Sequence, residues 1–184
     1  MQKILIAGPQ GSGKGTQATR LSQKLGIPAL SMGQLLRDQI TEGGELGKEI
    51  SKVIYEDGEL VSDELALRIL KKRLEQADAQ DGYILDGYPR NVEQYNAFKA
   101  FDMPTAVILI NVPLDESMRR LARRADIEKR ADDEPEQIKR RLEIYEEETK
   151  PVLELFKSQG VLKVIDGMGT MEEVEERIEE ALVI

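Results

Sequence analysis

Short, mainly apolar runs, several of them continuously apolar, alternate along the chain with longer segments in which apolar residues recur every three or four positions. The short runs predict strands that are covered on both faces, and the longer segments predict amphipathic helices. The predicted strands are Lys3–Ala7, Ala29–Leu30, Tyr83–Leu85, Ala106–Val112 and Val161–Ile165. The predicted helices are Gly15–Leu25, Met32–Glu42, Leu46–Tyr55, Ser62–Gln76, Asn91–Phe101, Asp115–Arg124, Pro135–Gln159 and Met171–Leu182. We therefore expect an α/β fold, in which a five-stranded parallel sheet is flanked by helices and ligands bind at the carboxyl ends of the strands.

A glycine-rich segment, Gly8-Pro-Gln-Gly-Ser-Gly-Lys-Gly-Thr16, joins the first predicted strand to the first predicted helix. Strand, glycine-rich turn, lysine and helix in this order are typical of a phosphate-binding loop. Glycines let backbone N–H groups surround a phosphate, the helix start adds partial positive charge, and Lys14 adds a full charge. The alternative is a chance glycine-rich turn, which the spacing and the strand–helix context argue against.

A second candidate site is Gly82-Tyr-Ile-Leu-Asp-Gly-Tyr-Pro-Arg-Asn91, where a predicted strand ends in Asp86. An acid at a strand end beside a phosphate loop can orient magnesium through its water shell, and Arg90 can clamp a phosphate. The alternative is a tight strand-to-helix turn with an ordinary salt bridge. The phosphate loop at 8–16 favours the phosphate site.

The length of 184 residues predicts a single domain over 1–184. The composition of the chain excludes several classes of function. No apolar stretch is long enough to span a membrane, and no signal peptide is visible, so we expect a cytoplasmic protein. The chain has no cysteine, which excludes disulfides, and no histidine, which excludes a histidine base. A net charge of −9, with no tryptophan, argues against nucleic-acid binding.

Against this acidic background, seven arginines lie between Arg119 and Arg141. Acidic residues are interleaved with them, so a solvated helix face with ion pairs is one interpretation. The phosphate loop favours another, because a phosphate site needs converging cations.

The loop has one unusual feature, since Gly15 takes the place of the usual Ser or Thr and Thr16 follows. Gly-Lys-Gly-Thr and Asp86-Gly-Tyr-Pro-Arg90 resemble the nucleoside monophosphate kinases, and the adenylate kinase family most closely. The resemblance covers nearly the whole chain and implies a P-loop NTPase fold with a cis Tyr88–Pro89 bond. It implies reversible transfer of the γ-phosphate of ATP to AMP, giving two ADP, with Mg²⁺ as cofactor. A helical monophosphate-binding segment, 31–61, and a short lid, 124–133, of the class without zinc are implied too, as is a monomer.

The resemblance also implies where AMP binds. Ser31-Met-Gly-Gln-Leu-Leu-Arg37 and Gly58-Glu-Leu-Val61 resemble two family segments that contact the monophosphate, and Gln94 has the position whose amide reads adenine. Without the resemblance, Arg37 would be interpreted as a surface helix residue. The AMP site implied in this way comprises Met32, Arg37, Glu59, Leu60, Val61, Gly87, Arg90, Gln94, Arg130 and Arg141.

The ATP site is implied by three further matches: Arg120-Leu-Ala-Arg-Arg124, Arg130-Ala-Asp-Asp133 and Asp166-Gly-Met-Gly-Thr170. By the match, Arg120 stacks on the ATP base, while the carboxylates Asp132 and Asp133 hold and release the lid. The implied ATP site comprises Gly11, Ser12, Gly13, Lys14, Gly15, Thr16, Arg120, Arg124 and Gly169, with Asp86 holding the metal through water. The implied catalytic cations are Lys14, Arg90, Arg124, Arg130 and Arg141.

Two residues depart from the family pattern: Met32 replaces a Thr in the monophosphate pocket, and Gln34 replaces an Asp that helps to order magnesium waters. Uridylate–cytidylate kinases share most of these motifs and remain an alternative, against which Gln94 favours AMP. A non-catalytic ATP-binding module is a further alternative, which the many arginines argue against. A GTPase is disfavoured because the chain has no Asn-Lys-x-Asp segment.

Overall fold

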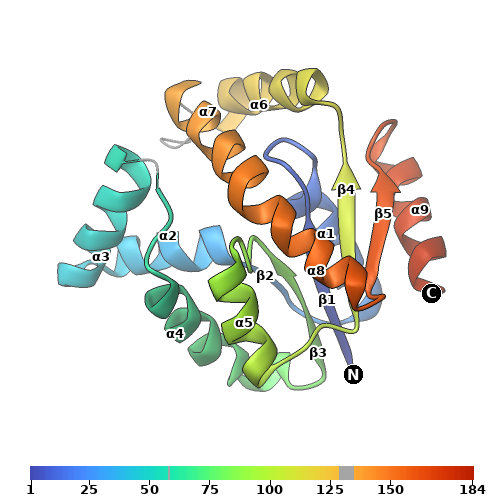
Figure 1. Ribbon diagram of the computed structural model, residues 1–184, viewed down its shortest axis with the longest axis horizontal. Coiled ribbons are helices and arrows are strands. Elements are labelled where there is room, and N and C mark those ends of the chain that lie inside the picture. The colour runs from blue at the N-terminus through green and yellow to red at the C-terminus, as the bar shows by residue number, and fades with distance from the viewer. Residues whose placement is uncertain (58, 129–134) are drawn as a thin grey trace.

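A computed structural model describes residues 1–57, 59–128 and 135–184 of the protein (Figure 1). These residues form a five-stranded sheet in the order β2-β3-β1-β4-β5, in which every neighbouring pair is parallel. The strands are β1 (Gln2–Ala7), β2 (Ala29–Ser31), β3 (Gly82–Asp86), β4 (Ala106–Asn111) and β5 (Leu162–Asp166). The predicted α/β fold with a parallel sheet is therefore confirmed.

Helices follow the strands in the predicted alternation. The α-helices are α1 (Lys14–Leu25), α2 (Met32–Glu42), α3 (Gly44–Ser51), α4 (Asp63–Leu74), α5 (Val92–Phe101), α6 (Leu114–Glu128), α7 (Pro135–Ile144), α8 (Lys150–Ser158) and α9 (Met171–Leu182). The described residues also form two π-helical segments, η1 (Lys52–Asp57) and η3 (Tyr145–Thr149), and a 3₁₀ turn, η2 (Ala77–Ala79). Among these helices, none is long and apolar enough to cross a membrane.

Side chains that alternate along the strands build a core on each face of the sheet. Ile4 and Ile6 of β1 join the core that α1 and α9 cover, whereas Leu5 joins the core that α2, α3, α4, α5 and α8 cover. All three side chains are at most 2% exposed. The continuously apolar strands thus reflect helices on both faces, as the pattern predicts.

The carboxyl ends of the strands meet at one edge of the sheet, where the chain places its unusual turns. In the register of the sheet, Asp86 at the end of β3 lies opposite Ile6 of β1 and Ser31 of β2. Figure 1 shows α6 beyond this edge, in the direction in which β4 points. The segments that were predicted to bind phosphate therefore meet in space.

The opposite edge carries a polar cluster of its own. Asp102 accepts a hydrogen bond from the hydroxyl of Tyr83 at 2.9 Å and pairs with the ammonium group of Lys3. Burial, and then the neighbouring carboxylate, raises the pKa of Tyr83, so its hydroxyl stays a donor. This cluster joins β1, β3 and the segment after α5 at the far end from the phosphate loop.

The structure corrects three predicted helix boundaries. The predicted helix Leu46–Tyr55 passes from α3 into the π-helical η1, and Pro135–Gln159 is divided into α7, η3 and α8. The helix predicted to end at Arg124 continues to Glu128. Apolar spacing indicates a helical segment, but it does not record whether the backbone hydrogen bonds are of the α or the π type, nor where a polar helix ends.

Candidate active site

The phosphate loop is shaped by glycines that no other residue could replace without strain. Gly11 has φ of +81°, and a Cβ atom at this position would lie 2.4 Å from the backbone oxygen of Ser117 in α6. Gly13 has φ of +88° and precedes α1, whose first turn has no side-chain cap among the described residues. The loop therefore packs closely under α6 and leaves the N–H groups at the start of α1 to a ligand.

Asp86 lies next to this loop. Its Oδ2 is 3.8 Å from the place that a Cβ atom of Gly15 would occupy. Its Oδ1 is buried and has no hydrogen-bond partner among the described residues. A carboxylate with an unsatisfied oxygen beside a phosphate site suits a hydrated divalent cation. Within the described part of the chain there is no cluster of three or more His, Cys, Asp or Glu that could bind a metal directly.

One cavity of about 210 Å³ brings most of the predicted acceptor site together. Part of its wall comes from the carboxyl edge of the sheet, namely β1, the phosphate loop and the turn after β3. Most of the rest comes from α2, the segment after η1, α5, α7, η3 and α8. The predicted site residues that line it are Lys14, Met32, Arg37, Glu59, Leu60, Val61, Asp86, Gly87, Arg90, Gln94 and Arg141. Residues that are far apart in sequence thus share one cavity, as the interpretation of the motifs requires.

Four of the lining residues are cations, and they come from four different parts of the fold. Lys14 begins α1, Arg37 lies on α2, Arg90 follows β3 and Arg141 lies on α7. The Nζ of Lys14 donates to the carbonyl of Pro9 at 3.2 Å. Such convergence of positive charge in a protein of net charge −9 is an anion-binding feature.

The turn that carries Arg90 is fixed at both of its ends. The Nε of Arg90 donates to the carbonyl of Gly87 at 3.0 Å, and its own carbonyl accepts from the hydroxyl of Thr149 in η3 at 2.8 Å. The Tyr88–Pro89 bond is cis, as predicted. These contacts direct the Arg90 guanidinium along the turn, beside Gly87.

Gln94 and Met32 both line the cavity, and each is only 3% exposed. The Oε1 of Gln94 accepts from the backbone N–H of Arg90 at 2.8 Å, and its Nε2 donates to Asp63 at 2.9 Å. Nearby, burial and then the charge of Asp63 raise the pKa of Tyr88 to about 12. The Gln94 amide is therefore held between a backbone donor and a carboxylate acceptor.

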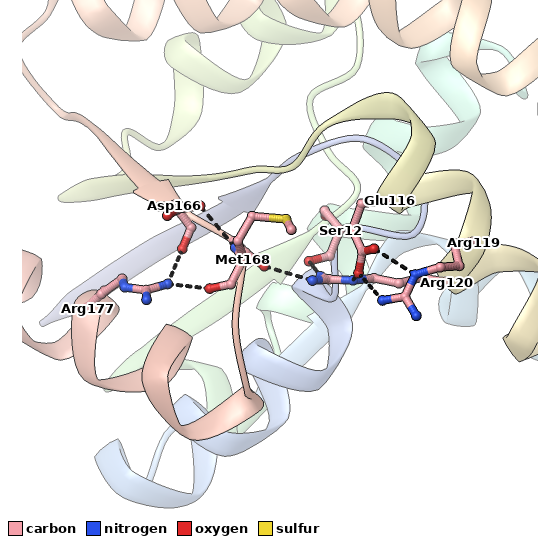
Figure 2. A network of polar contacts seen from close by, with 8 residues as sticks. Ser12, Glu116, Arg119, Arg120, Asp166, Met168 and Arg177 are labelled. Atoms are coloured by element: carbon pink, nitrogen blue, oxygen red, sulfur yellow. Dashed lines mark hydrogen bonds and ion pairs between the residues drawn. The ribbon is translucent and has the colours of Figure 1, made fainter.

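A second group of predicted residues lies outside the cavity, around the phosphate loop (Figure 2). Arg120 of α6 donates to the carbonyl oxygens of Ser12 at 3.3 Å and of Gly167 at 3.0 Å, and its Nε donates to Glu116 at 2.6 Å. It therefore ties the phosphate loop to the segment after β5. The predicted ATP-site residues that do not line the cavity are Gly11, Ser12, Gly13, Gly15, Thr16, Arg120 and Gly169.

Ion pairs and hydrogen bonds hold the surroundings of Arg120 in place. Hydrogen bonds from Arg119, and then from Arg120, lower the pKa of Glu116 to about 2. On the other side, Arg177 of α9 donates to the carbonyl oxygens of Asp166 at 2.9 Å and of Met168 at 2.5 Å (Figure 2). Arg177 thus fixes the segment that precedes α9.

Some predicted residues fall beyond the described part of the chain. Arg130, Asp132 and Asp133 lie outside the described residues, and so does the side chain of Arg124, although its backbone belongs to α6. Their predicted contributions to the site stay predictions.

The sequence interpretation overlooked several residues at the site. Thr149, Tyr145 and the apolar residues Val152, Leu153 and Phe156 line the cavity from η3 and α8. Their helical spacing predicted a buried face but not which ligand cavity it borders. Asp63 was also overlooked, because its contact with Gln94 joins residues 31 positions apart.

One pair of contacts joins the segment after α3 to α7, across one side of the cavity. Arg140 donates to Oε1 of Glu59 from Nε at 2.9 Å and from Nη2 at 2.7 Å. Beside it, Gln137 donates to the backbone oxygen of Tyr55. These contacts therefore bridge two segments that line the cavity.

Comparisons with known proteins agree with this geometry. The family model described as "Adenylate kinase" matches residues 6–161. The chain is 45% identical over 181 residues to "Adenylate kinase" of Stenotrophomonas maltophilia (strain R551-3), with 96% of each chain covered. It is 44% identical over 185 residues to "Adenylate kinase" of Xanthomonas euvesicatoria pv. vesicatoria (strain 85-10), with 98% of each covered.

Proposed function

This chain belongs to the adenylate kinase family, and on that premise we propose that its cavity binds AMP while the phosphate loop binds ATP beside it. The chain is an ATP:AMP phosphotransferase, which transfers the γ-phosphate of ATP to AMP and gives two ADP. The observation that carries the proposal is the single cavity in which Lys14 of the phosphate loop meets Arg37, Arg90 and Arg141.

In this reaction an oxygen of the AMP phosphate forms a bond to the γ-phosphorus while the bond to the β–γ bridging oxygen breaks. The bridging oxygen leaves with the electron pair as part of ADP. The attacking oxygen is already ionised near neutral pH, so the reaction needs no general base and the absence of histidine is no obstacle. Catalysis is then positioning plus stabilisation of the charge that spreads over the transferred group.

We assign the acceptor side to the cavity. Arg37 and Arg90 hold the phosphate of AMP by charge-assisted hydrogen bonds, and Arg141 completes this set from α7. Gln94 faces the base, with Met32 packed beside it. Gly87 and the backbone of Glu59, Leu60 and Val61 line the remaining wall.

We assign the donor side to the phosphate loop, from Gly11 to Thr16, with Lys14 at the outer phosphates. Arg120 donates to the loop at Ser12 and to the segment after β5 at Gly167, which supports a position beside a nucleotide that spans the two. Gly169 belongs to the segment that would frame the base. Arg124 and Arg130 are proposed as further transfer-site cations, on the family match alone.

Mg²⁺ fits this site through Asp86, whose buried Oδ1 has no partner among the described residues. When bound with ATP it neutralises charge on the phosphates. Adenylate kinases generally use Mg²⁺ with ATP, and we propose that Asp86 orients it through its water shell here, with no requirement for zinc. We further propose that 31–61 and 124–133 close over the nucleotides to exclude water, and that the protein acts as a cytoplasmic monomer.

The experiment is to incubate the purified protein with Mg-ATP and, in separate reactions, AMP, UMP, CMP and GMP, and to quantify the diphosphates. AMP-dependent formation of ADP, with conversion of ADP back to ATP and AMP, is the expected result. A preference for UMP or CMP would move the acceptor assignment and would implicate Met32. Binding of ATP without transfer to any acceptor would contradict the proposal.

A further inference from the structure

We propose that Asp63 is a positioning residue that locks the amide of Gln94 in one orientation. The locked amide selects acceptor bases with an exocyclic amino group over bases with an oxo group at the same place. This inference rests on the proposed function, in which Gln94 faces the base of the monophosphate.

Asp63 begins α4 and does not line the cavity, so it acts through its neighbours. Its Oδ1 accepts from Nε2 of Gln94 at 2.9 Å and from Nδ2 of Asn91 at 3.0 Å. Asn91 in turn caps α5, because its Oδ1 accepts from the backbone N–H of Gln94 at 2.7 Å. One carboxylate oxygen therefore restrains both the side chain of Gln94 and the residue that caps its helix.

The orientation of the Gln94 amide follows from its two partners. The backbone N–H of Arg90 can only donate, so the amide atom 2.8 Å away must be the acceptor Oε1. A carboxylate can only accept, so the atom at Asp63 must be the donor Nε2. A flipped amide would oppose donor to donor and acceptor to acceptor. At 3% exposure, no solvent would compensate for that mismatch.

The locked amide keeps one N–H and one lone pair of Oε1 for a ligand. An amino base such as adenine presents a donor on its exocyclic nitrogen and an acceptor on the adjacent ring nitrogen. These fit Oε1 and Nε2 respectively. An oxo base such as hypoxanthine presents the reverse pattern, and meeting it in the same position would require the flipped amide. Because buried unpaired polar groups are costly, the amide discriminates against the oxo base.

Asp63 restrains the nitrogen of the Gln94 amide, which the backbone N–H of Arg90 does not contact. The contact with Arg90 restrains the oxygen of the amide, whereas the nitrogen is restrained by Asp63. Without the carboxylate of Asp63, the Gln94 amide can rotate out of the plane in which it pairs with the base. Its Nε2 can then donate to another acceptor. Discrimination should then fall more than affinity for AMP does.

The test measures equilibrium binding of AMP and of IMP, which differ in the amino and oxo groups, without ATP. We compare the wild type with Asp63→Leu, which removes the acceptor, and with Asp63→Asn, which keeps an oxygen acceptor. Glu64→Leu is the matched control, since Glu64 is an exposed acid in the same first turn of α4. The Glu64→Leu substitution removes one negative charge from the first turn of α4, as Asp63→Leu does.

We expect the wild type to bind AMP more tightly than IMP, and Asp63→Leu to lower the ratio of the two affinities about 10-fold. Asp63→Asn and Glu64→Leu should keep the ratio within about 3-fold of the wild type. An Asp63→Leu ratio equal to that of the wild type would overturn the inference, and so would a wild type that binds IMP as tightly as AMP.

If Asp63→Leu does not fold, the side-chain amide of Gln94 in the wild-type protein decides the matter by NMR. The hydrogen donated to Asp63 should exchange with solvent more slowly than its partner, and equal exchange of both would overturn the inference. Failure of the proposed function looks different. The wild type would then discriminate AMP from IMP in binding yet transfer no phosphate.

Discussion

A single oxygen of Gln34 orients the guanidinium group of Arg37. Gln34 Oε1 accepts from Nε of Arg37 at 3.2 Å and from Nη2 at 3.0 Å, while its Nε2 donates to Asp38 at 2.7 Å. The acceptor is a neutral amide, so Arg37 is held in place and its charge is not offset. That charge stays available to an anion in the cavity that Arg37 lines.

Replacing this neutral acceptor by a carboxylate should weaken AMP binding. In Gln34→Glu the side chain keeps its length but forms a charge-assisted pair with Arg37, which competes with the phosphate. We expect the KM for AMP to rise about 5-fold while the KM for ATP changes little. Initial rates with each nucleotide varied in turn measure both constants. Gln39→Glu, on the same helix, is the control, and an equal effect there would exclude the pairing as the cause.

Removing the cation of the phosphate loop should abolish most turnover. Lys14→Met keeps much of the side chain's bulk but not its charge, so kcat should fall by a factor on the order of 1,000 with a native circular dichroism spectrum. Lys24→Met, at the far end of α1, removes a lysine that pairs with Glu179 at 2.5 Å and should leave kcat near normal. Near-normal turnover of Lys14→Met would contradict the proposed donor site.

Restoring the family's threonine at Met32 should sharpen the choice of base. Met32 is 3% exposed and lines the same cavity as Gln94, so on the proposed function Met32→Thr places a hydroxyl where it can contact the base. We expect the ratio of kcat/KM for AMP over CMP to increase. The shorter side chain also costs about 1–3 kcal/mol of stability. Met118→Thr, at an exposed position, should change neither quantity. An unchanged AMP/CMP ratio in Met32→Thr would place Met32 away from the base.

The ion pairs around Glu116 should make a pH-dependent contribution to stability. Hydrogen bonds from Arg119 and then Arg120 lower the folded-state pKa of Glu116 from 4.5 to about 2. Its contribution is therefore complete above about pH 4.5 and is lost as the pH falls towards 2. The difference in unfolding free energy between wild type and Glu116→Gln should be largest at pH 7 and smaller at pH 3.

Urea unfolding at pH 7, 4.5 and 3 measures this difference. Glu154→Gln, which breaks a pair with Lys157 between exposed side chains, should show little difference at any of the three values. A Glu116→Gln difference that stays constant from pH 7 to pH 3 would contradict the lowered pKa.

Local signals were sufficient for much of this fold. Short, mainly apolar runs located all five strands. Ser62 was predicted to start a helix, and its hydroxyl accepts from the N–H of Leu65 at 3.4 Å at the start of α4. The π-helical turns in η1 and η3 were not predicted, since side-chain spacing does not record the type of backbone hydrogen bond in a helix. The order of strands also depends on packing between distant segments, which periodicity does not record.

For the site, motifs predicted which residues meet but not what holds them. The match placed Gln94, Arg37 and Arg90 at the acceptor, and all three line the cavity. Their partners Asp63 and Thr149 come from other elements, and no spacing rule connects them to the motif. Gln34 was noted only as a departure at the magnesium site, whereas in the structure it orients Arg37.

The bridge between Arg140 and Glu59 implies that dissolved salt acts on this protein at one wall of the cavity, where α7 meets the segment after η1. Both side chains are 40% or more exposed, so their attraction is screened over about 10 Å at 0.1 M ionic strength. The cations that line the cavity are partly buried, so their attraction for a bound phosphate is screened less. Raising the ionic strength should therefore weaken the Arg140–Glu59 contact at low salt concentrations. The affinity of the cavity for a bound phosphate should fall only at higher concentrations.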